Sequence, residues 1–472
     1  MGDEVSISVS NVITIDNPSR ELLSWCTQNL RLRNPEYAKK QRMHFWVGNT
    51  PEYLYLYETH GDKIILPYGT LRQVISIVPE DVGRGNNVYI RDFPVAEKID
   101  YGCEIPLYDY QQKAVDEVYW KQYGILQSAA GSGKTQMGIA LIAKFGKRAL
   151  WLTHTKDLLL QSKERARQYM GEALLGTITE GKVNIGRGIT FATVQTMCNL
   201  DLTQYKDMWD VIIVDECHRV TGTPTAVSQF SKVLNSLAAR HKYGLSATVH
   251  RSDGLIQATF ALLGEVVYTV PTEAVADKIM KVGINPIPTG IGLSRACLNT
   301  DGTLNYAKLI GYLSESDERN RLIVECITTD RDKPALILSD RLGHLETLMA
   351  MLPSNMQKDA VMVSGKMTTK KGKAEREQAI ADMRSGAKKY LFATYSLAKE
   401  GLDVPRLERL YMATPQKDYA VITQAIGRIA RTSEGKADPI CFDFVDDIQF
   451  LVKAYKKRCT TYRKNGCYFV ER

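Results

Sequence analysis

The stretch Ser128-Ala-Ala-Gly-Ser-Gly-Lys-Thr135 decides the fold of the chain, because it joins an apolar strand-like run to the start of a helix. Two glycines allow the backbone to turn so that its N–H groups point at phosphate oxygens, and the lysine extends to the β- and γ-phosphates. The pattern departs from G-x-x-x-x-G-K-[ST] only at its first position. We therefore predict a phosphate-binding loop made of Ser128, Ala129, Ala130, Gly131, Ser132, Gly133, Lys134 and Thr135.

A second stretch, Val211-Ile-Ile-Val-Asp-Glu-Cys-His218, places two carboxylates directly after four β-branched residues. Such a run predicts a buried central strand with Asp215 and Glu216 at its tip. Asp215, together with the Thr135 hydroxyl, is suited to hold Mg²⁺, and Glu216 to orient or deprotonate a water. The two stretches together predict hydrolysis of a nucleoside triphosphate, with ATP and Mg²⁺ as cofactors.

Two further clusters suit the same chemistry. Gln424, Arg428 and Arg431 are spaced by four and three residues, which predicts one helical face. Arginines offered to a γ-phosphate act as arginine fingers, and the alternative is a salt-bridged surface helix. Tyr110 and Gln111 pair an aromatic ring with an amide, which can stack on adenine and recognise its edge.

The chain divides into a short N-terminal part, which we expect to be β-rich or α+β, and two α/β lobes. In the first part we predict strands at 44–47, 53–57, 63–66 and 74–78, with a turn at 58–62. Strands alternate with helices from about residue 107, pause in a proline- and glycine-containing linker at 281–303, and then resume. The predicted domains are an N-terminal accessory domain (1–103), a first lobe (104–281) and a second lobe (282–472). In the two lobes the predicted strands are 124–127, 149–153, 189–192, 211–214, 243–246, 335–338, 360–363, 390–393, 409–413 and 440–444.

Composition places the chain among ordinary globular proteins, with 44% hydrophobic and 24% charged residues. No apolar run approaches the ~18 residues that span a membrane, and the polar first ten residues resemble no signal peptide. Nine cysteines lack any Cys-x-x-Cys pair, so we expect free thiols and a cytoplasmic location. The net charge of +8 is compatible with a polyanionic partner. The basic residues after position 453 are expected on a solvated helix face.

In this order the motifs resemble those of superfamily 2 helicases, over roughly residues 107–444. Asp215 to His218 resembles a DECH variant of motif II, Gly244-Leu-Ser-Ala-Thr248 motif III, and Thr394 to Pro405 motif V. Ser246 to Gly254 and Tyr306 to Asn320 are most similar to the XPB and phage UvsW group. The resemblance implies two RecA-like lobes with ATP between them, in a bacteriophage or viral protein of the host cytoplasm. It implies that Gly401 and Asp403 face the nucleotide, and that His218, Ser246 and Thr248 couple hydrolysis to lobe movement.

The resemblance also implies a nucleic-acid track across both lobes. Hydroxyls, amides and cations after the strands can hold phosphates without recognising bases. The track residues are Thr153, Lys156, Thr193, Gln195, Arg251, Ser339, Arg341, Gly365, Thr394 and Ser396. For Thr193 and Thr394 the alternative is a helix cap, and for His218 it is a core hydrogen bond.

The leading hypothesis is therefore an ATP-dependent DNA helicase or translocase, active as a monomer on forked, branched or single-stranded DNA without sequence preference. The alternatives are an RNA helicase and an ATPase that remodels protein–DNA complexes without unwinding. The role of the N-terminal domain stays open. Its aromatic residues Phe45, Trp46, Tyr53, Tyr55 and Tyr57 can stack on bases, but such residues more often form a core or a docking surface.

Overall fold

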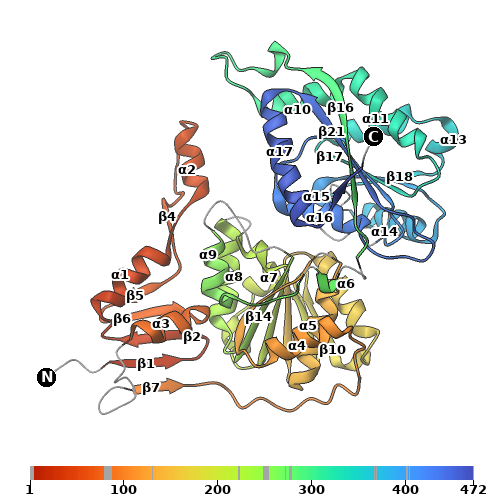
Figure 1. Cartoon of the computed structure of the whole chain (residues 1–472). Coiled ribbons are helices and arrows are strands. Elements are labelled where there is room, and N and C mark those ends of the chain that lie inside the picture. The colour runs from red at the N-terminus through yellow and green to blue at the C-terminus, as the bar shows by residue number, and fades with distance from the viewer. Residues whose placement is uncertain are drawn as a thin grey trace. The chain divides into compact units, whose positions relative to one another are not determined.

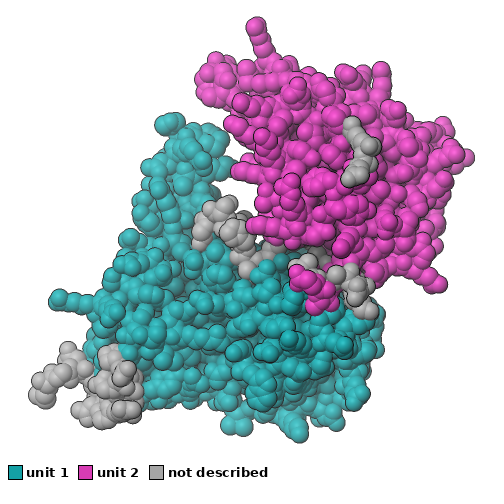
Figure 2. Space-filling model, in the orientation of Figure 1, with its two compact units in different colours: residues 1–128, 133–271 teal, residues 129–132, 272–472 magenta. Residues whose placement is uncertain are grey.

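The computed structural model describes residues 5–78, 88–129, 131–221, 224–247, 255–271, 273–275, 279–365, 367, 369–399, 402 and 404–470. The chain forms two compact units, coloured separately in Figure 2. Unit 1 comprises residues 1–128 and 133–271, and unit 2 comprises residues 129–132 and 272–472. Among the described residues, no helix is long and apolar enough to cross a membrane.

Unit 1 begins with a mixed sheet in the order β5-β6-β2-β1-β7. Its strands are β1 (Ser6–Val9), β2 (Val12–Asp16), β5 (Glu58–His60), β6 (Lys63–Pro67) and β7 (Val88–Arg91). The helices of this part are α1 (Arg20–Asn29), α2 (Pro35–Arg42) and α3 (Leu71–Ile77), and β3 (Arg31–Arg33) pairs separately with β4 (Tyr53–Tyr55). The β1–β7 pair is parallel, whereas β5, β6, β2 and β1 are antiparallel neighbours.

The rest of unit 1 is an eight-stranded sheet in the order β11-β10-β12-β9-β13-β14-β8-β15 (Figure 1). All of its pairs are parallel except β10 with β11. The strands are β8 (Tyr123–Gln127), β9 (Ala149–Thr153), β10 (Leu175–Thr179), β11 (Lys182–Asn184), β12 (Ile189–Thr193), β13 (Val211–Asp215), β14 (His241–Ser246) and β15 (Val266–Thr269). The helices are α4 (Asp109–Tyr119), α5 (Lys134–Phe145), α6 (Lys156–Arg167), α7 (Val194–Cys198), α8 (Pro224–Ser236) and α9 (Ile256–Leu263).

Unit 2 holds a seven-stranded parallel sheet in the order β18-β19-β17-β20-β21-β16-β22. Its strands are β16 (Gly283–Gly292), β17 (Ala335–Ser339), β18 (Ala360–Val363), β19 (Tyr390–Thr394), β20 (Arg409–Met412), β21 (Ile440–Asp447) and β22 (Tyr468–Phe469). Its helices are α10 (Tyr306–Glu315), α11 (Asp317–Thr329), α12 (Leu342–Met351), α13 (Ser354–Gln357), α14 (Lys370–Ser385), α15 (Tyr395–Lys399), α16 (Tyr419–Ile429) and α17 (Gln449–Lys464). The predicted fold class is confirmed: two parallel RecA-like α/β sheets follow an N-terminal mixed sheet.

Two predicted N-terminal strands are wrong. Residues 44–47 form no regular element, and 74–78 fall largely in helix α3. In α3 the buried positions are Leu71 and Val74, three residues apart. That spacing is typical of a helix, but the β-branched residues of the segment favoured the prediction of a strand.

The predicted linker at 281–303 is also wrong, because it contains the ten-residue strand β16. Among the described residues, strand β22 pairs with β16 at Gly283 and Ile284, and further along β16 the paired strand is β21. Pro286 and Pro288 are two residues apart and therefore share one edge of the strand. Proline cannot donate to a ladder, and an edge without a neighbouring strand tolerates it.

The basic tail is not wholly solvated. Arg458 of α17 is 1% exposed, and it donates through Nε and Nη2 to the two carboxylate oxygens of Asp443 at 2.8 and 2.9 Å. Arg319 of α11 makes a similar buried pair with Asp446, with a shortest N–O distance of 2.7 Å. Both carboxylates lie on β21, so two fully desolvated ion pairs tie helices to one strand.

The N-terminal sheet shares a core with the sheet that follows it. Tyr68 lies in one apolar cluster with Tyr123, Val227 and Ala258 from the second part of unit 1. Its hydroxyl donates to the carbonyl oxygen of Arg240 at 3.0 Å. A side chain at Gly69 would collide with the backbone at Gly264, so the two surfaces approach at backbone distance. The N-terminal part is therefore an integral layer of unit 1.

A buried lysine lies at this junction. Lys242 of β14 is 0% exposed, and its Nζ donates to the carbonyl oxygens of Asn11 at 3.2 Å and Leu234 at 2.7 Å. Its ammonium lies 5.2 Å from the centroid of the Tyr68 ring. No carboxylate of the described residues forms an ion pair with it. Burial lowers the pKa of Lys242 to about 7.

We predict that Lys242 makes stability depend on pH. Because its folded pKa is below the usual value of 10.5, the unfolded chain binds more protons between about pH 7 and 10, and stability rises with pH there. Up to about 1.4 kcal/mol per pH unit is expected. Urea unfolding of the protein and of Lys242→Met between pH 7 and 9 measures this, and the difference between them should change with pH. Exposed Lys206→Met is the control, and a difference that stays constant with pH contradicts the prediction.

Candidate functional site

The phosphate-binding loop has the backbone that its sequence predicts. Gly131 and Gly133 have φ values of 85° and 82°, in the left-handed region that side chains disfavour. Helix α5 begins at Lys134, immediately after the loop, so the N–H groups of its first turn face the phosphate position. The loop is tied to β14 by a hydrogen bond of 3.0 Å from the Ser128 N–H to the Ser246 carbonyl oxygen.

The two carboxylates stand at the carboxyl end of β13, as predicted. Asp215 is 5% exposed and accepts hydrogen bonds from the Ser162 hydroxyl at 3.2 Å and the Glu216 N–H at 2.9 Å. Burial, together with the neighbouring Glu216 charge, raises the pKa of Asp215, and the Lys134 ammonium opposes this shift. Burial disfavours the ionised form of this carboxylate, so a cation bound beside it would stabilise that form.

Glu216 connects the loop to the neighbouring strand. Its φ of 47° lies in the left-handed region, which is unusual for a residue with a side chain and common at functional sites. One oxygen lies 4.0 Å from Lys134 Nζ and the other 3.3 Å from His218 Nδ1. The same His218 nitrogen is 3.1 Å from the Ser246 hydroxyl. A continuous polar chain therefore runs from the lysine to the end of β14.

These residues fit ATP and Mg²⁺. The lysine, the left-handed glycines and the start of α5 form a cradle for phosphates, and half-buried Thr135 lies in the first turn of α5. Among the described residues, no group of three or more His, Cys, Asp or Glu side chains could form a metal cage. Mg²⁺ needs no such cage, since one carboxylate, a hydroxyl, waters and phosphate oxygens complete its octahedron.

Gln111 lies against the phosphate loop. It is 2% exposed, and its Oε1 accepts from the Tyr108 N–H at 3.0 Å in a capping box at the start of α4. A side chain at Gly133 would collide with its Nε2. Tyr110 stacks on Tyr108 with ring centroids 5.9 Å apart. The structure brings Gln111 to the loop, and adenine recognition by this pair stays a prediction.

The predicted arginine face is only partly a helix face. Gln424 and Arg428 belong to α16, but the helix ends at Ile429 and Arg431 follows it. Arg431 instead forms an isolated β-bridge with Ile279. Arg428 Nε donates to the Ala398 carbonyl oxygen at 2.9 Å, which anchors the arginine to α15. Helical spacing therefore relates only the first two of the three residues, because the chain leaves the helix before the third.

The predicted track residues that the structure describes lie at the carboxyl ends of strands or in the residues that follow them. Thr193 and Thr153 are register partners at the ends of β12 and β9, as Ser339 and Thr394 are in β17 and β19. The others are distributed among exposed Arg341, Gly365 and Ser396, half-buried Gln195, and Lys156, which is ion-paired to Glu180 at 2.7 Å.

Several of the track hydroxyls are engaged within the protein. Thr153 Oγ1 donates to the Thr155 carbonyl oxygen at 3.0 Å. Thr193 pairs with Thr196 and Thr394 with Ser396, each at 3.0 Å between hydroxyl oxygens. The alternative of a side-chain helix cap does not apply to Thr193, whose side chain makes no such bond.

Five predicted site residues lie outside the described residues: Ala130, Thr248, Arg251, Gly401 and Asp403. Two contributors were missed. Ser162 of α6 donates to Asp215, and His154 lies 3.3 Å from the Gln195 amide. No local pattern marks Ser162, whereas His154 directly follows the predicted residue Thr153.

Comparison with known proteins identifies both lobes. Residues 104–251 match the family model "Type III restriction enzyme, res subunit", and residues 318–433 match "Helicase conserved C-terminal domain". The chain belongs to helicase superfamily 2. The predicted ATP-dependent helicase enzyme is thereby confirmed, and so is nucleic-acid binding at this coarse level.

The relatives of the chain include a viral helicase and an XPB helicase. The helicase is 25% identical to the "Putative ATP-dependent RNA helicase" of Acanthamoeba polyphaga mimivirus, over 91% of this chain and 78% of that protein. It is 26% identical to the "DNA 3'-5' helicase XPB" of Kineococcus radiotolerans, over 63% of this chain and 52% of that protein. The crystal structure of T4 UvsW aligns with 99% of this chain and 98% of that chain, at 18% identity and a TM-score of 0.42.

We predict that Lys134→Ala and Glu216→Gln each lower the rate of ATP hydrolysis by about 100-fold or more, because each removes a group placed at the reacting phosphate. Glu216→Gln should still bind ATP, since the amide preserves the shape of the side chain. Phosphate release and a fluorescent ATP analogue measure the two properties. Lys144→Ala, an exposed lysine on the same helix that is paired with Asp116, is the matched control. Hydrolysis retained in both site variants would refute the assignment.

Proposed function

We propose that the helicase uses ATP hydrolysis to move along DNA and to unwind or branch-migrate forked and junction DNA, in replication, recombination or repair. The observation that carries the proposal is the polar chain from Lys134 through Glu216 and His218 to Ser246. It links the hydrolytic carboxylate to Ser246, the last residue of β14, which lies within motif III. A change at the γ-phosphate can therefore reach the strand that leads towards the nucleic-acid track.

In this proposal Asp215 and Thr135 hold Mg²⁺, which neutralises phosphate charge when bound. Glu216 orients the attacking water and accepts its proton. Arg428 and Arg431 supply the arginine fingers of the second lobe, by resemblance to the family. The track contacts phosphates only, so the helicase acts without sequence preference. We further propose that it acts as a monomer.

A DNA-binding role for the N-terminal part is supported by an arm that comprises residues 31–55 (β3, α2 and β4). Helix α2 contains no buried residue, and Figure 1 shows it projecting from the sheet. Phe45 is 60% and Trp46 88% exposed just beyond the helix. The arm also carries five cations, Arg31, Arg33, Lys39, Lys40 and Arg42. Exposed aromatic rings beside cations suit stacking on unpaired bases at a fork.

An RNA helicase is the second candidate, since the mimivirus relative carries that name and RNA presents the same phosphate track. The distinction rests on contacts with the 2′-hydroxyl. ATPase stimulation and strand displacement on matched linear, forked, four-way and RNA-containing substrates test the proposal. We expect the strongest stimulation and displacement with forked or four-way DNA. Preference for RNA favours the second candidate. DNA-stimulated hydrolysis without displacement favours a remodelling ATPase, and hydrolysis indifferent to all nucleic acids sinks both helicase proposals.

For the arm, we predict that the double variant Phe45→Ala/Trp46→Ala lowers fork unwinding about tenfold, because two stacking surfaces are removed. ATPase stimulated by single-stranded DNA should be unchanged. Val183→Ala, an exposed apolar side chain on edge strand β11, serves as the control. Point variants are preferable to deleting residues 1–100, because deletion would expose the core that Tyr68 shares with the first lobe. Equal unwinding by variant and control would assign the arm no role at the fork.

A further inference from the structure

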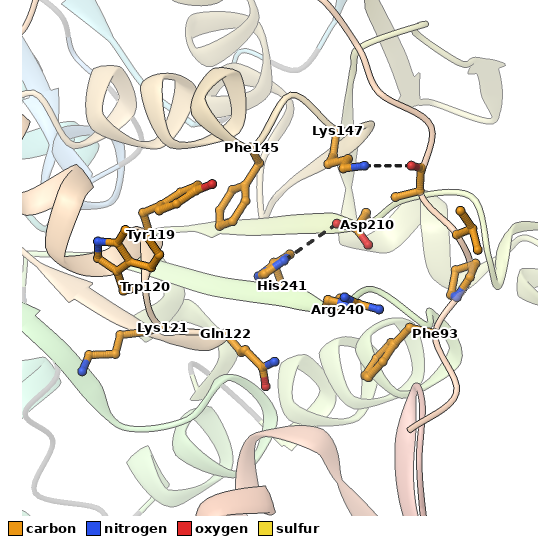
Figure 3. Close-up of a pocket in the computed structure, with 13 residues that line it drawn as sticks. Phe93, Tyr119, Trp120, Lys121, Gln122, Phe145, Lys147, Asp210, Arg240 and His241 are labelled. Atoms are coloured by element: carbon orange, nitrogen blue, oxygen red, sulfur yellow. Dashed lines mark hydrogen bonds and ion pairs between the residues drawn. The ribbon is translucent and has the colours of Figure 1, made fainter. Parts of the chain in front are cut away.

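A hollow of about 520 Å³ lies at the edge of the unit 1 sheet opposite to the phosphate loop (Figure 3). Asp210 precedes β13, His241 begins β14 and Gln122 precedes β8, so the hollow opens at the amino ends of these strands. The phosphate loop and the two carboxylates follow the carboxyl ends of β8 and β13. The hollow is therefore separate from the ATP site and from the predicted track.

Aromatic side chains line the hollow. In Figure 3 the rings of Tyr119, Trp120 and Phe145 lie on one side, and Phe93 lies on the other with Arg240. Tyr119 and Phe145 have ring centroids 4.7 Å apart. Trp120, the residue that caps α4, is 80% exposed. A large indole left in water beside a hollow offers a surface on which a planar group can stack.

A second hollow of about 230 Å³ shares the lining residues Trp120, Lys121 and Gln122 with the first, so both hollows border this segment. We refer to the two hollows together as the Trp120 groove. Five cations line the groove: Arg72, Arg91, Lys121, Lys147 and Arg240. The carboxylate that lines it is Asp210, which is 7% exposed.

The structure holds several of these cations in place through uncharged groups, and the charges of Arg240 and Lys147 also act on the Asp210 carboxylate, where they oppose the larger effect of burial on its pKa. Arg91 donates to the Tyr89 hydroxyl at 2.7 Å and to Gln122 Oε1 at 3.2 Å. Arg240 lies over the Phe93 ring at 5.6 Å, and Lys147 donates to a carbonyl oxygen at 2.8 Å. Within the described part of the chain, none of the five forms an ion pair. By contrast, the nearby Lys144 and Arg148 are paired with Asp116 and Glu97.

We propose that the groove across Trp120 is a second nucleic-acid site, which binds a strand with an unpaired base stacked on the indole and its phosphates on the flanking cations. Cations line the hollows on both sides of the shared segment. This arrangement suits a nucleic-acid strand, in which each nucleotide carries one negative charge and one base. An acidic peptide fits less generally, because only a peptide with an aromatic residue at one defined position could stack on the indole. This proposal rests on the proposed function only because both assume that the protein binds nucleic acid. Binding at the groove requires no ATP hydrolysis.

The test is binding of fluorescein-labelled forked DNA and forked RNA to the full chain without ATP, measured by anisotropy across a salt series. Trp120→Ala should weaken binding about five- to 100-fold, and Trp120→Phe should restore most of it. Arg91→Glu/Arg240→Glu should weaken binding and lower the salt slope by about one to two. Lys206→Glu, an exposed lysine on the same edge outside the groove, is the matched control and should leave binding unchanged. An oligonucleotide with 5-iodouracil should cross-link to Trp120.

Basal ATP hydrolysis separates this proposal from the function proposed above. The groove variants should keep it, whereas failure of the helicase proposal would appear with the unaltered protein. Unchanged affinity and salt slope in Trp120→Ala and in the double variant would overturn the site. Cross-links confined to the carboxyl-edge loops would do the same. Binding of an acidic peptide ending in phenylalanine that depends on Trp120, without an effect on oligonucleotides, would assign the groove to a protein partner and overturn the proposal.

Discussion

The order of three strands controls the chemistry of this helicase. Strand β14 lies between β8 and β13 in a parallel sheet, so the phosphate loop after β8 and the carboxylates after β13 flank Ser246. The Ser128 N–H bonds to the Ser246 carbonyl, while the Ser246 hydroxyl faces His218. A sheet with another strand order would separate these groups. The crossover topology of the first lobe is therefore what turns two sequence motifs into one site.

The same sheet has two edges with different roles. Its carboxyl edge collects buried polar groups such as Lys134 and Asp215. Its amino edge is joined to the N-terminal sheet through Tyr68 and the buried Lys242, and it bears the groove beside Trp120. Packing of the N-terminal sheet buries Lys242, and the desolvation of its ammonium costs free energy, which appears as a lowered pKa. Two hydrogen bonds to carbonyl oxygens and the shared apolar core offset this cost. The N-terminal part is consequently a structural layer as well as the base of the exposed arm.

Sequence patterns predicted the α/β strands well because a buried parallel strand needs an uninterrupted apolar run. The runs at Ala149–Thr153 and Ala360–Val363 agree with the structure at both ends. The patterns failed where a neighbouring strand or side chain determines the structure of a segment. Prolines suggested a linker at β16, although a strand edge without a neighbour accepts them. The segment Tyr306 to Asn320 supported the family resemblance. In the structure, Arg319 of this segment forms a buried ion pair with Asp446.

By itself the sequence determined the phosphate loop, the carboxylate pair and the alternation of strands and helices, because each depends on residues adjacent in the chain. Left-handed glycines, the helix start that follows them and an apolar strand are local properties. Only the tertiary structure decided that Ser162 bonds to Asp215, that Arg431 lies beyond its helix, and that Trp120 is exposed in a groove lined by cations. Those relations join residues tens to hundreds of positions apart or depend on where a helix ends against its neighbours, and no local periodicity encodes them.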